Sequence, residues 1–270
     1  MARCGVLVTP QIFRVGKRTQ YQLCVLIGTS SEVPGLVNRE SIVYFDRAEA
    51  RARDFASMIG YTAAPKNQAP DDWHLFFGDS DLTLRHPFRP SVRLSLDDVR
   101  RRSLSGRRSP LAKACGVREG TTVLDAFAGW GTDGLTLATL GCLVTCCELQ
   151  PLVFAMLYDR IKRFKPSPPQ CLRGDVCELL TNTGQSWDVV YVDPMFPPHP
   201  KTALPSHAVQ VLADLAEPSD AREIVERSFE RANRRVVVKN RKKEPPIIGA
   251  PDWQIRARTV RFDVYRTDRN

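Results

Sequence analysis

The chain has 270 residues, of which 43% are apolar, and it can therefore bury a sizeable core in one domain or in two small ones. Its 39 lysines and arginines outnumber its 30 acidic residues and give a net charge of +9, which favours a polyanionic partner over a neutral metabolite. No run of about eighteen apolar residues occurs, so we expect no membrane-spanning helix and no membrane partner.

The eight cysteines form no C-x-x-C pair, and most stand in apolar, strand-like runs. That pattern is typical of buried free thiols in a reducing compartment. The alternative is a metal site built from Cys142, Cys146 and Cys147. Because neighbouring residues of a strand point to opposite faces, we expect no metal there.

The first thirty-one residues contain four basic side chains and no acidic one, and Glu32 is the first acid. This composition is typical of a mitochondrial targeting segment. The alternative is an ordinary β-hairpin, because residues 21–28 have the pattern of a strand that ends at a glycine. From the residues alone both interpretations stand for this N-terminal extension, residues 1–40.

Residues 41–118 have the mixed pattern of a small α+β module. We expect a strand over 42–45, a helix over 48–59 and further strands over 73–77 and 82–84. The module closes on a strongly basic segment, for which RNA phosphate contact and simple solvation are equally good interpretations. The candidate phosphate ligands in this segment are Arg101, Arg102, Arg107 and Arg108.

Residues 119–270 consist of short apolar runs separated by spacers of helix length. This pattern is typical of a parallel sheet covered by helices on both faces, and it predicts a doubly wound α/β domain. Residues 253–259 and 260–265 have almost no spacer between them and should pair as an antiparallel hairpin at the sheet edge. The predicted parallel strands are residues 123–124, 143–147, 171–172, 189–192 and 236–238.

The first of these strands leads into a turn with Gly129 and Gly131, and then into a helix expected over residues 133–140. Glycines let the backbone turn sharply and let a ligand approach where a Cβ would stand. A dinucleotide site is one interpretation, since Gly134 supplies a third glycine. Asp125 at the strand end favours S-adenosylmethionine, because its carboxylate would repel a pyrophosphate but attract the cationic amino acid portion of that cofactor.

Two more acidic residues follow the next two strands. Glu148 stands about twenty residues beyond the glycine turn, where a carboxylate can accept both hydroxyls of an adenosine ribose. Asp175 follows the third strand and can accept a hydrogen bond from the adenine amino group. Each acid alone is equally typical of a helix cap or a solvated turn. Acids at three successive strand ends favour a cofactor site, because these ends meet at the crevice where open sheets bind ligands.

Asp193, Pro194, Met195 and Phe196 follow the fourth strand and form the most informative segment of the chain. An exocyclic base amine is a poor nucleophile, because its lone pair is delocalised into the ring. The Asp193 carboxylate and the Pro194 carbonyl would accept both N–H bonds and free that lone pair, while Phe196 offers a face on which the base can stack. A proline-rich loop without such a role is the alternative.

A base inside a helix cannot reach such a pocket, so we expect a single-stranded, looped or flipped substrate. Lys201 and Lys239 are candidate phosphate ligands, and either is equally typical of a solvated lysine. The methyl donor carries its own positive sulfonium, so the transfer needs alignment of the two reactants and requires no metal.

These segments resemble the RsmJ (YhiQ) family of bacterial small-subunit ribosomal RNA guanine-N2 methyltransferases. The similarity runs from about residue 41 to the C-terminus, and the Asp-Pro-Met-Phe-Pro stretch is its most specific part, whereas the glycine loop is general to the superfamily. The segments that carry the resemblance are residues 111–116, 125–133, 190–197, 201–204, 235–239 and 261–265.

The resemblance implies a Rossmann-like class I methyltransferase fold, with a seven-stranded sheet and an antiparallel edge hairpin. It also implies methylation of a guanine N2 amine in small-subunit ribosomal RNA. The chain departs from the family at Leu149, where an arginine is typical beside the ribose position, and at Val176, where paired serines are typical near the adenine. The cofactor contacts that carry over are Thr132, Asp133, Glu148, Asp175 and Asp193.

Since residues 1–40 precede the family's domain, the resemblance favours an organelle address for them and a mitochondrial matrix location, with the cytoplasm as the alternative. The expected partner is small-subunit ribosomal RNA or its assembly intermediate, with ribosomal assembly proteins as further candidates. One alternative function is a factor that binds ribosomal RNA during assembly and has little or no catalysis. Another is methylation of a protein amide or a DNA amine through the same acceptor geometry.

Overall fold

The computed structural model describes residues 41–79, 81–165, 167–195, 206–216 and 219–267, together with the backbone of residues 7–15 and 18–26. No helix within these ranges is long and apolar enough to cross a membrane.

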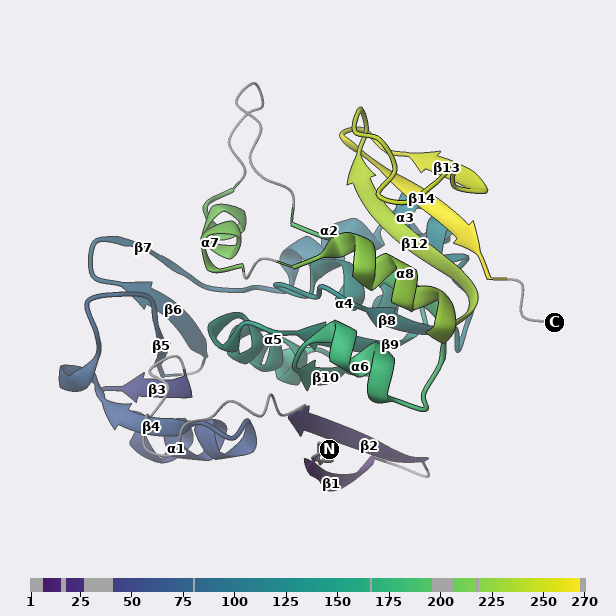
Figure 1. Cartoon of the computed structure of the whole chain (residues 1–270). Helices are drawn as coiled ribbons and strands as arrows, with labels where there is room; N and C mark the ends of the chain where they lie inside the picture. The colour runs from purple at the N-terminus through teal and green to yellow at the C-terminus, as the bar shows by residue number, and fades with distance from the viewer. Residues whose placement is uncertain are drawn as a thin grey trace, which may run out of the picture.

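The core of the molecule is a mixed sheet whose central strands run parallel (Figure 1). Seven strands follow the order β10-β9-β8-β11-β12-β14-β13, and the last two pairings are antiparallel. This order confirms the predicted class I sheet with its antiparallel edge. The strands are β8 (Thr122–Asp125), β9 (Leu143–Glu148), β10 (Gln170–Arg173), β11 (Trp187–Val192), β12 (Ala232–Arg241), β13 (Trp253–Arg256) and β14 (Val260–Arg266).

Two further strands extend the sheet at its β10 edge, which gives nine strands among the residues that the structure describes. β1 (Leu7–Val15) and β2 (Arg18–Leu26) form an antiparallel hairpin, and β2 pairs in parallel with β10. Of the two interpretations of the N-terminal segment, the structure therefore shows the hairpin.

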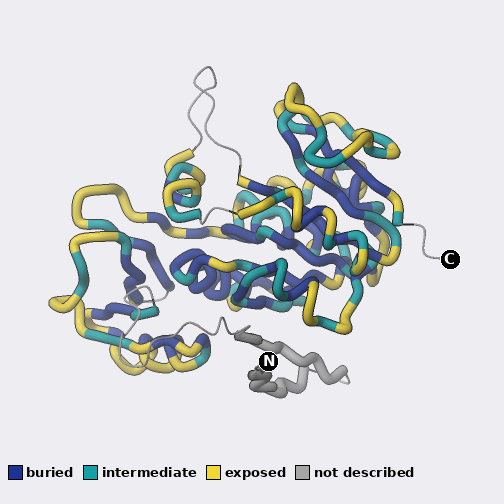
Figure 2. The backbone as a smooth tube through the Cα atoms, in the orientation of Figure 1, coloured by how far each residue is buried: buried dark blue, intermediate teal, exposed yellow. Residues whose placement is uncertain are grey.

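Helices cover both faces of the sheet, as expected (Figure 1). Neighbouring residues of one strand, such as Val190 and Tyr191 of β11, pack into two separate hydrophobic clusters, one on each face. Figure 2 shows the central strands as mostly buried backbone. The helices that follow the strands are α4 (Thr132–Thr139), α5 (Pro151–Arg163), α6 (Val176–Asn182), α7 (His207–Leu215) and α8 (Ala221–Arg231).

A second, five-stranded sheet forms the N-terminal module, in the order β4-β3-β5-β6-β7. It packs against α5, where the rings of Phe55 and Tyr158 lie 6.0 Å apart and the Tyr61 hydroxyl donates a hydrogen bond to the Pro151 carbonyl at 2.8 Å. One hydrophobic cluster spans both parts, so the module and the larger sheet share a core. The module contains β3 (Ile42–Phe45), α1 (Glu49–Met58), β4 (Thr62–Pro65), the 3-10 turn η2 (Lys66–Gln68), β5 (His74–Phe77), β6 (Leu82–His86) and β7 (Arg89–Val92).

Three short elements join the module to the larger sheet: α2 (Asp97–Ser103), the 3-10 turn η3 (Gly106–Arg108) and α3 (Pro110–Cys115). α2 packs on α4, and α3 packs on β12, β13 and β14. Ser109 caps α3 by accepting a hydrogen bond from the Ala112 backbone N–H, and Gly116 ends the helix with a left-handed backbone. The basic segment is thereby held against the larger sheet, and the division of the chain at residue 118 stays a prediction.

The six cysteines from Cys115 to Cys177 are free, and all but Cys177 are buried. Burial raises the pKa of the Cys142 thiol to about 12, so this side chain stays a neutral, apolar group in the core. The described residues hold no group of three or more His, Cys, Asp or Glu side chains arranged for a metal ion.

Candidate functional site

A cavity of about 420 Å³ lies at the carboxyl ends of the parallel strands, where the sequence places its acids. Within the described part of the chain, seven acidic side chains line it, against two basic ones, Arg102 and Lys239. In a protein of net charge +9 this cavity therefore favours a cationic ligand. The acids are Asp125, Asp133, Glu148, Asp175, Asp193, Asp220 and Glu223.

The glycine turn needs glycine at two positions. Gly129 and Gly131 have φ of +51° and +76°, a region that other residues rarely adopt. A Cβ on Gly131 would also stand 2.4 Å from Cδ1 of Leu157. The backbone can therefore turn tightly over α5, and α4 begins directly afterwards at Thr132.

Glu148 holds this turn in place from the end of β9. Its carboxylate accepts hydrogen bonds from the backbone N–H of Gly129 and from that of Gln150, both at 2.9 Å. Burial raises the pKa of Glu148 from 4.5 to about 7, and the backbone donors oppose that rise. Glu148 therefore titrates near neutrality. The sequence did not indicate its contact with the glycine turn.

Asp125 at the end of β8 is only 1% exposed, and its Oδ1 has no hydrogen-bond partner among the described residues. Burial raises its pKa well above the ordinary value, and the nearby carboxyls of Asp133 and Asp193 raise it further. A buried carboxyl without a cation is costly, so a positively charged ligand at this point would stabilise it.

Asp175 is the N-cap of α6, and its Oδ1 accepts from the N–H groups of Cys177 and Glu178 at 2.6 and 3.4 Å. The helix-cap interpretation of this acid therefore holds, although Asp175 also lines the cavity. The two positions of departure from the family line the cavity as well: Leu149 is 37% exposed and Val176 is buried.

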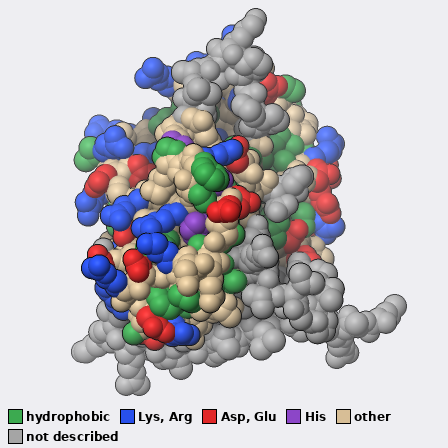
Figure 3. Space-filling view, turned by 90° about the vertical axis from the view of Figure 1, so that its left-hand side faces the viewer, with side chains coloured by type: hydrophobic (Ala, Val, Ile, Leu, Met, Phe, Trp, Pro, Cys, Tyr) green, Lys and Arg blue, Asp and Glu red, His purple; other side chains and the backbone are tan. Residues whose placement is uncertain are grey.

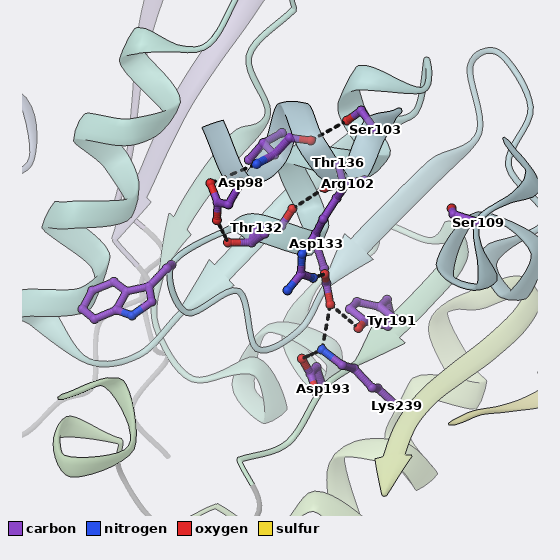
Figure 4. Close-up of polar contacts among 12 residues, drawn as sticks. Asp98, Arg102, Ser103, Ser109, Thr132, Asp133, Thr136, Tyr191, Asp193 and Lys239 are labelled. Atoms are coloured by element: carbon purple, nitrogen blue, oxygen red, sulfur yellow. Dashed lines mark hydrogen bonds and ion pairs between the residues drawn. The ribbon is translucent and has the colours of Figure 1, made fainter. Parts of the chain in front are cut away.

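Asp133 lies at the centre of a polar network in the cavity (Figure 4). One carboxylate oxygen pairs with Arg102 of α2, while the other accepts from the Tyr191 hydroxyl at 2.7 Å and from Lys239 Nζ at 2.9 Å. Burial would raise the pKa of Asp133, but Lys239 and Arg102 outweigh it and lower that pKa to about 2. Within the described residues, Asp133 is therefore a carboxylate, ionised at neutral pH, that links α2, α4 and the sheet.

Lys239 also donates to Asp193 Oδ2 at 2.7 Å, so one ammonium group bridges two carboxylates (Figure 4). The two residues meet because Val192 of β11 is in register with Val238 of β12. Burial raises the pKa of Asp193, Lys239 opposes that rise, and Asp133 adds to it. Lys239 was predicted as a phosphate ligand, whereas its partners here are two carboxylates inside the cavity.

A second network, which the sequence did not reveal, secures the start of α4. Arg160 of α5 is 1% exposed and donates to the Trp130 carbonyl at 2.7 Å, to Thr132 Oγ1 at 3.0 Å and to Asp98 of α2. Thr132 Oγ1 in turn donates to Asp98 Oδ2 at 2.8 Å. Thr132, predicted as a cofactor contact, thus also ties α2 to the glycine turn. The sequence signal for this network was Arg160, a charged residue within the mostly apolar helical stretch 151–163.

Of the four arginines predicted to bind RNA, only Arg102 lines the cavity. Arg101, Arg107 and Arg108 are exposed, and Arg107 lies 3.7 Å from Glu119. Pro194 is buried directly after Asp193. Phe196 and Lys201 lie outside the described residues.

Comparison with known proteins identifies the family. The family model described as "Putative SAM-dependent methyltransferase" matches residues 91–267. Ribosomal RNA small subunit methyltransferase J of Pseudomonas paraeruginosa is 35% identical over 240 residues, which cover 82% of this chain and 91% of the relative. The chain belongs to this family of SAM-dependent methyltransferases.

Two further relatives agree with this assignment. Ribosomal RNA small subunit methyltransferase J of Pseudomonas fluorescens is 33% identical and is matched over 87% of this chain and 97% of its own length. The crystal structure of a SAM-dependent methyltransferase from Neisseria gonorrhoeae is 26% identical, with a TM-score of 0.65 and coverage of 84% and 96%. The predicted family and the class I methyltransferase fold are thus confirmed.

The mitochondrial location expected from residues 1–40 is wrong. The curated relatives come from bacteria such as Pseudomonas, Thioalkalivibrio and Desulfotalea, which have no mitochondria. The acid-free composition that suggested targeting belongs instead to the hairpin of β1 and β2 beside β10. Basic and apolar residues occur in both kinds of segment, so their composition could not separate the two.

Proposed function

We propose that this methyltransferase transfers a methyl group from S-adenosylmethionine to the exocyclic N2 amine of a guanine in small-subunit ribosomal RNA. The observation that carries the proposal is Asp193, a cavity-lining carboxylate after β11 that is followed at once by Pro194. The names of the relatives support small-subunit ribosomal RNA as the substrate. The guanine N2 amine is our own inference from the acceptor chemistry and the family resemblance.

The cofactor half of the cavity, defined by Asp125, Glu148 and Asp175, fits S-adenosylmethionine. The cofactor supplies an electrophilic methyl group on a positive sulfonium and carries a cationic amine. Asp125 would accept from that amine, because its Oδ1 has no partner among the described residues. Glu148 would accept from the ribose hydroxyls and Asp175 from the adenine amine, while the cavity-lining Leu149 and Val176 would contact the adenosine.

The acceptor half of the cavity, defined by Asp133, Asp193 and Lys239, would hold the target base. The Asp193 carboxylate and the Pro194 carbonyl would accept the two N–H bonds of the amine and leave its lone pair directed at the methyl group. Because Oδ2 of Asp193 already accepts a hydrogen bond from Lys239, we expect Oδ1 to accept from the target amine. Phe196 would stack on the base, and the methylated amine would lose its extra proton to water or to Asp193.

The decisive experiment maps modified guanines in a small-subunit ribosomal RNA transcript after incubation with the protein and radiolabelled S-adenosylmethionine. Asp193→Ala should lower methyl transfer about 100- to 1000-fold and leave cofactor affinity within about threefold. Asp54→Asn is the matched control, because Asp54 is exposed on α1 and does not line the cavity. Normal transfer by Asp193→Ala, or label only in protein or DNA fractions, would refute the proposal.

The alternative of an RNA-binding assembly factor with little catalysis rests on Leu149 and Val176, which replace polar residues typical of the family in the cofactor half. Titration calorimetry with S-adenosylmethionine separates the two functions. Binding below millimolar concentration supports the methyltransferase. RNA binding without measurable cofactor binding supports the assembly factor.

A further inference from the structure

The hairpin between β6 and β7 carries the aromatic side chain Phe88 at its tip, and this ring is 83% exposed. Its backbone N–H donates to Nδ1 of His86 at 3.1 Å, and the two rings lie 6.0 Å apart. The His86 ring in turn meets Trp73 edge-on at 5.1 Å. The tip is thus held in shape by its own neighbours, yet the Phe88 ring itself stays in solvent.

This tip is fixed to the helix that forms one wall of the cavity. His207 of α7 shares a hydrogen bond of 2.8 Å with the Pro90 carbonyl, and Arg89 pairs with Asp214 at 3.0 Å. The side chains of Val209 and Leu212 on the same helix line the cavity. In Figure 1, α7 lies beside the segment that leads from β7 towards α2. The hairpin that carries the exposed ring is therefore tied to a helix that lines the proposed active site.

One cationic side chain of α2, Arg102, lines the same cavity, and two more arginines precede it in that helix. Arg100 and Arg101 of α2 are exposed, while Arg102 on the next position lines the cavity. Figure 3 shows the face on the side of the five-stranded sheet, where Lys and Arg side chains lie next to histidine and hydrophobic side chains. Aromatic rings that accept bases, combined with cations that accept phosphates, are the pattern by which proteins bind single-stranded RNA.

We propose that Phe88 is a stacking platform for an unpaired base of the RNA that flanks the target guanine, while the α2 arginines hold phosphates of the same strand. This inference rests on the proposed function, because it places the RNA across the mouth of the methyl-transfer cavity. A protein partner is the less favoured occupant, since the arginines of α2 and the net charge of +9 complement a polyanion.

The geometry also explains why such an exposed ring would be useful. Phe88 contributes little to the core, so its removal should leave the stability of the fold almost unchanged. Stacking with a base would bury the ring and stabilise the bound strand. The ring would hold the strand in place while the target guanine enters the cavity.

The test compares Phe88→Ala with Phe88→Trp and with the control Leu143→Ala. Leu143 is 56% exposed at the amino end of β9, the end of the sheet away from the cavity. Binding of a short, fluorescently labelled single-stranded RNA that contains guanine is measured by anisotropy, alongside methylation of the small-subunit RNA transcript. Thermal unfolding of each variant is recorded in parallel.

Phe88→Ala should weaken RNA binding and raise the KM for RNA about 10-fold, with the KM for S-adenosylmethionine unchanged. Phe88→Trp should retain binding and Leu143→Ala should match the wild type. Two results would overturn the stacking role. One is unchanged RNA binding by Phe88→Ala, and the other is that Phe88→Ala binds an assembled subunit particle more weakly but binds naked RNA as the wild type does. If the wild type binds RNA but methylates none, the proposed function fails while the stacking role is still decided by the binding data.

Discussion

The two halves of the cavity differ in how the charges of their buried acids are balanced. In the acceptor half, Asp133 and Asp193 share the ammonium of Lys239, and Asp133 also pairs with Arg102. In the cofactor half, Asp125 has one oxygen without a partner in the described residues, and Glu148 accepts from backbone N–H groups. The protein therefore neutralises one half by itself and leaves the other half to a cationic ligand.

The pKa directions of Asp133 and Asp125 follow from this difference, although burial also raises the pKa of Asp193 in the acceptor half. Lys239 and Arg102 lower the pKa of Asp133 to about 2 in spite of its burial. Burial raises the pKa of Asp125, and two neighbouring carboxyls add to that effect. A buried carboxyl that is kept ionised by nearby cations, such as Asp133, stabilises the fold. A buried carboxyl that lacks such a cation until a ligand binds, such as Asp125, destabilises the protein in its ligand-free state. The acceptor half is thus preorganised, and the cofactor half is completed by binding.

Among the substitutions that test this difference between the two halves, we expect the largest effect from Lys239→Met. The loss of the ammonium raises the pKa of Asp193, so at a given pH fewer molecules carry the carboxylate that the amine needs. Methyl transfer near neutral pH should fall about 10- to 100-fold and should recover in part as the pH rises, because the acid limb of the rate profile moves upward. Lys239→Arg should retain more activity than Lys239→Met.

The rate profile between about pH 5 and about pH 9 gives the measurement. Lys66→Met serves as the control, since the ion pair of Lys66 with Asp46, at 3.5 Å, is exposed and Lys66 does not line the cavity. If Lys239→Met lowers the rate at every pH but leaves the acid limb at the wild-type pH, Lys239 does not hold Asp193 in its ionised form.

A smaller effect, of opposite sign in the two halves, is expected from Asp125→Asn and Asp133→Asn. Asp125→Asn removes a costly buried carboxyl, so the free energy of unfolding should rise by about 1 kcal/mol while affinity for S-adenosylmethionine falls about 10-fold. Asp133→Asn should lower the free energy of unfolding by about 2 kcal/mol, because Lys239 and Arg102 lose their shared partner.

Denaturant unfolding at neutral pH, without and with cofactor, compares these two variants. The wild-type contribution of Asp133 should be present above about pH 4 and should be lost as the pH falls through about 2, since its pKa is depressed. Equal destabilisation by both substitutions would contradict the difference between the halves.

The smallest effect concerns the pH dependence of cofactor binding. The pKa of Glu148 is raised from 4.5 to about 7, and the ribose hydroxyls would donate to its ionised form. Affinity for S-adenosylmethionine should therefore fall about fivefold from about pH 7 to about pH 6, as the carboxylate takes up a proton. Titration calorimetry measures it, and Glu148→Gln should bind weakly with little pH dependence. An equally steep change in Glu148→Gln would assign the titration to another group.

Much of the fold followed from local patterns. Apolar runs at helix-length spacing predicted the parallel strands, and the near-contiguous stretches after residue 253 predicted the antiparallel edge. The positions of Asp125, Glu148 and Asp193 at strand ends also followed, since the carboxyl ends of parallel strands meet at one edge. Pairings across long sequence separations did not follow, such as Arg160 with Asp98 and Lys239 with Asp133.

The N-terminal segment shows why composition alone was insufficient. A targeting segment and a basic edge strand both combine arginines with apolar and hydroxyl residues. What separates them is a hydrogen-bonding partner, here β10, which is about 145 residues further along the chain and leaves no local signal in the segment itself.

The sequence by itself determined the order of strands and helices, the glycine turn and five of the seven described acids that line the cavity, all but Asp220 and Glu223. These depend on residue periodicity and on backbone freedom at single positions. Only the tertiary structure decided which acids share a cation, because register between β11 and β12 and the packing of α2 on α4 bring Lys239 and Arg102 to Asp133. Charge compensation depends on distances of a few ångströms between residues remote in sequence, and folding alone sets those distances.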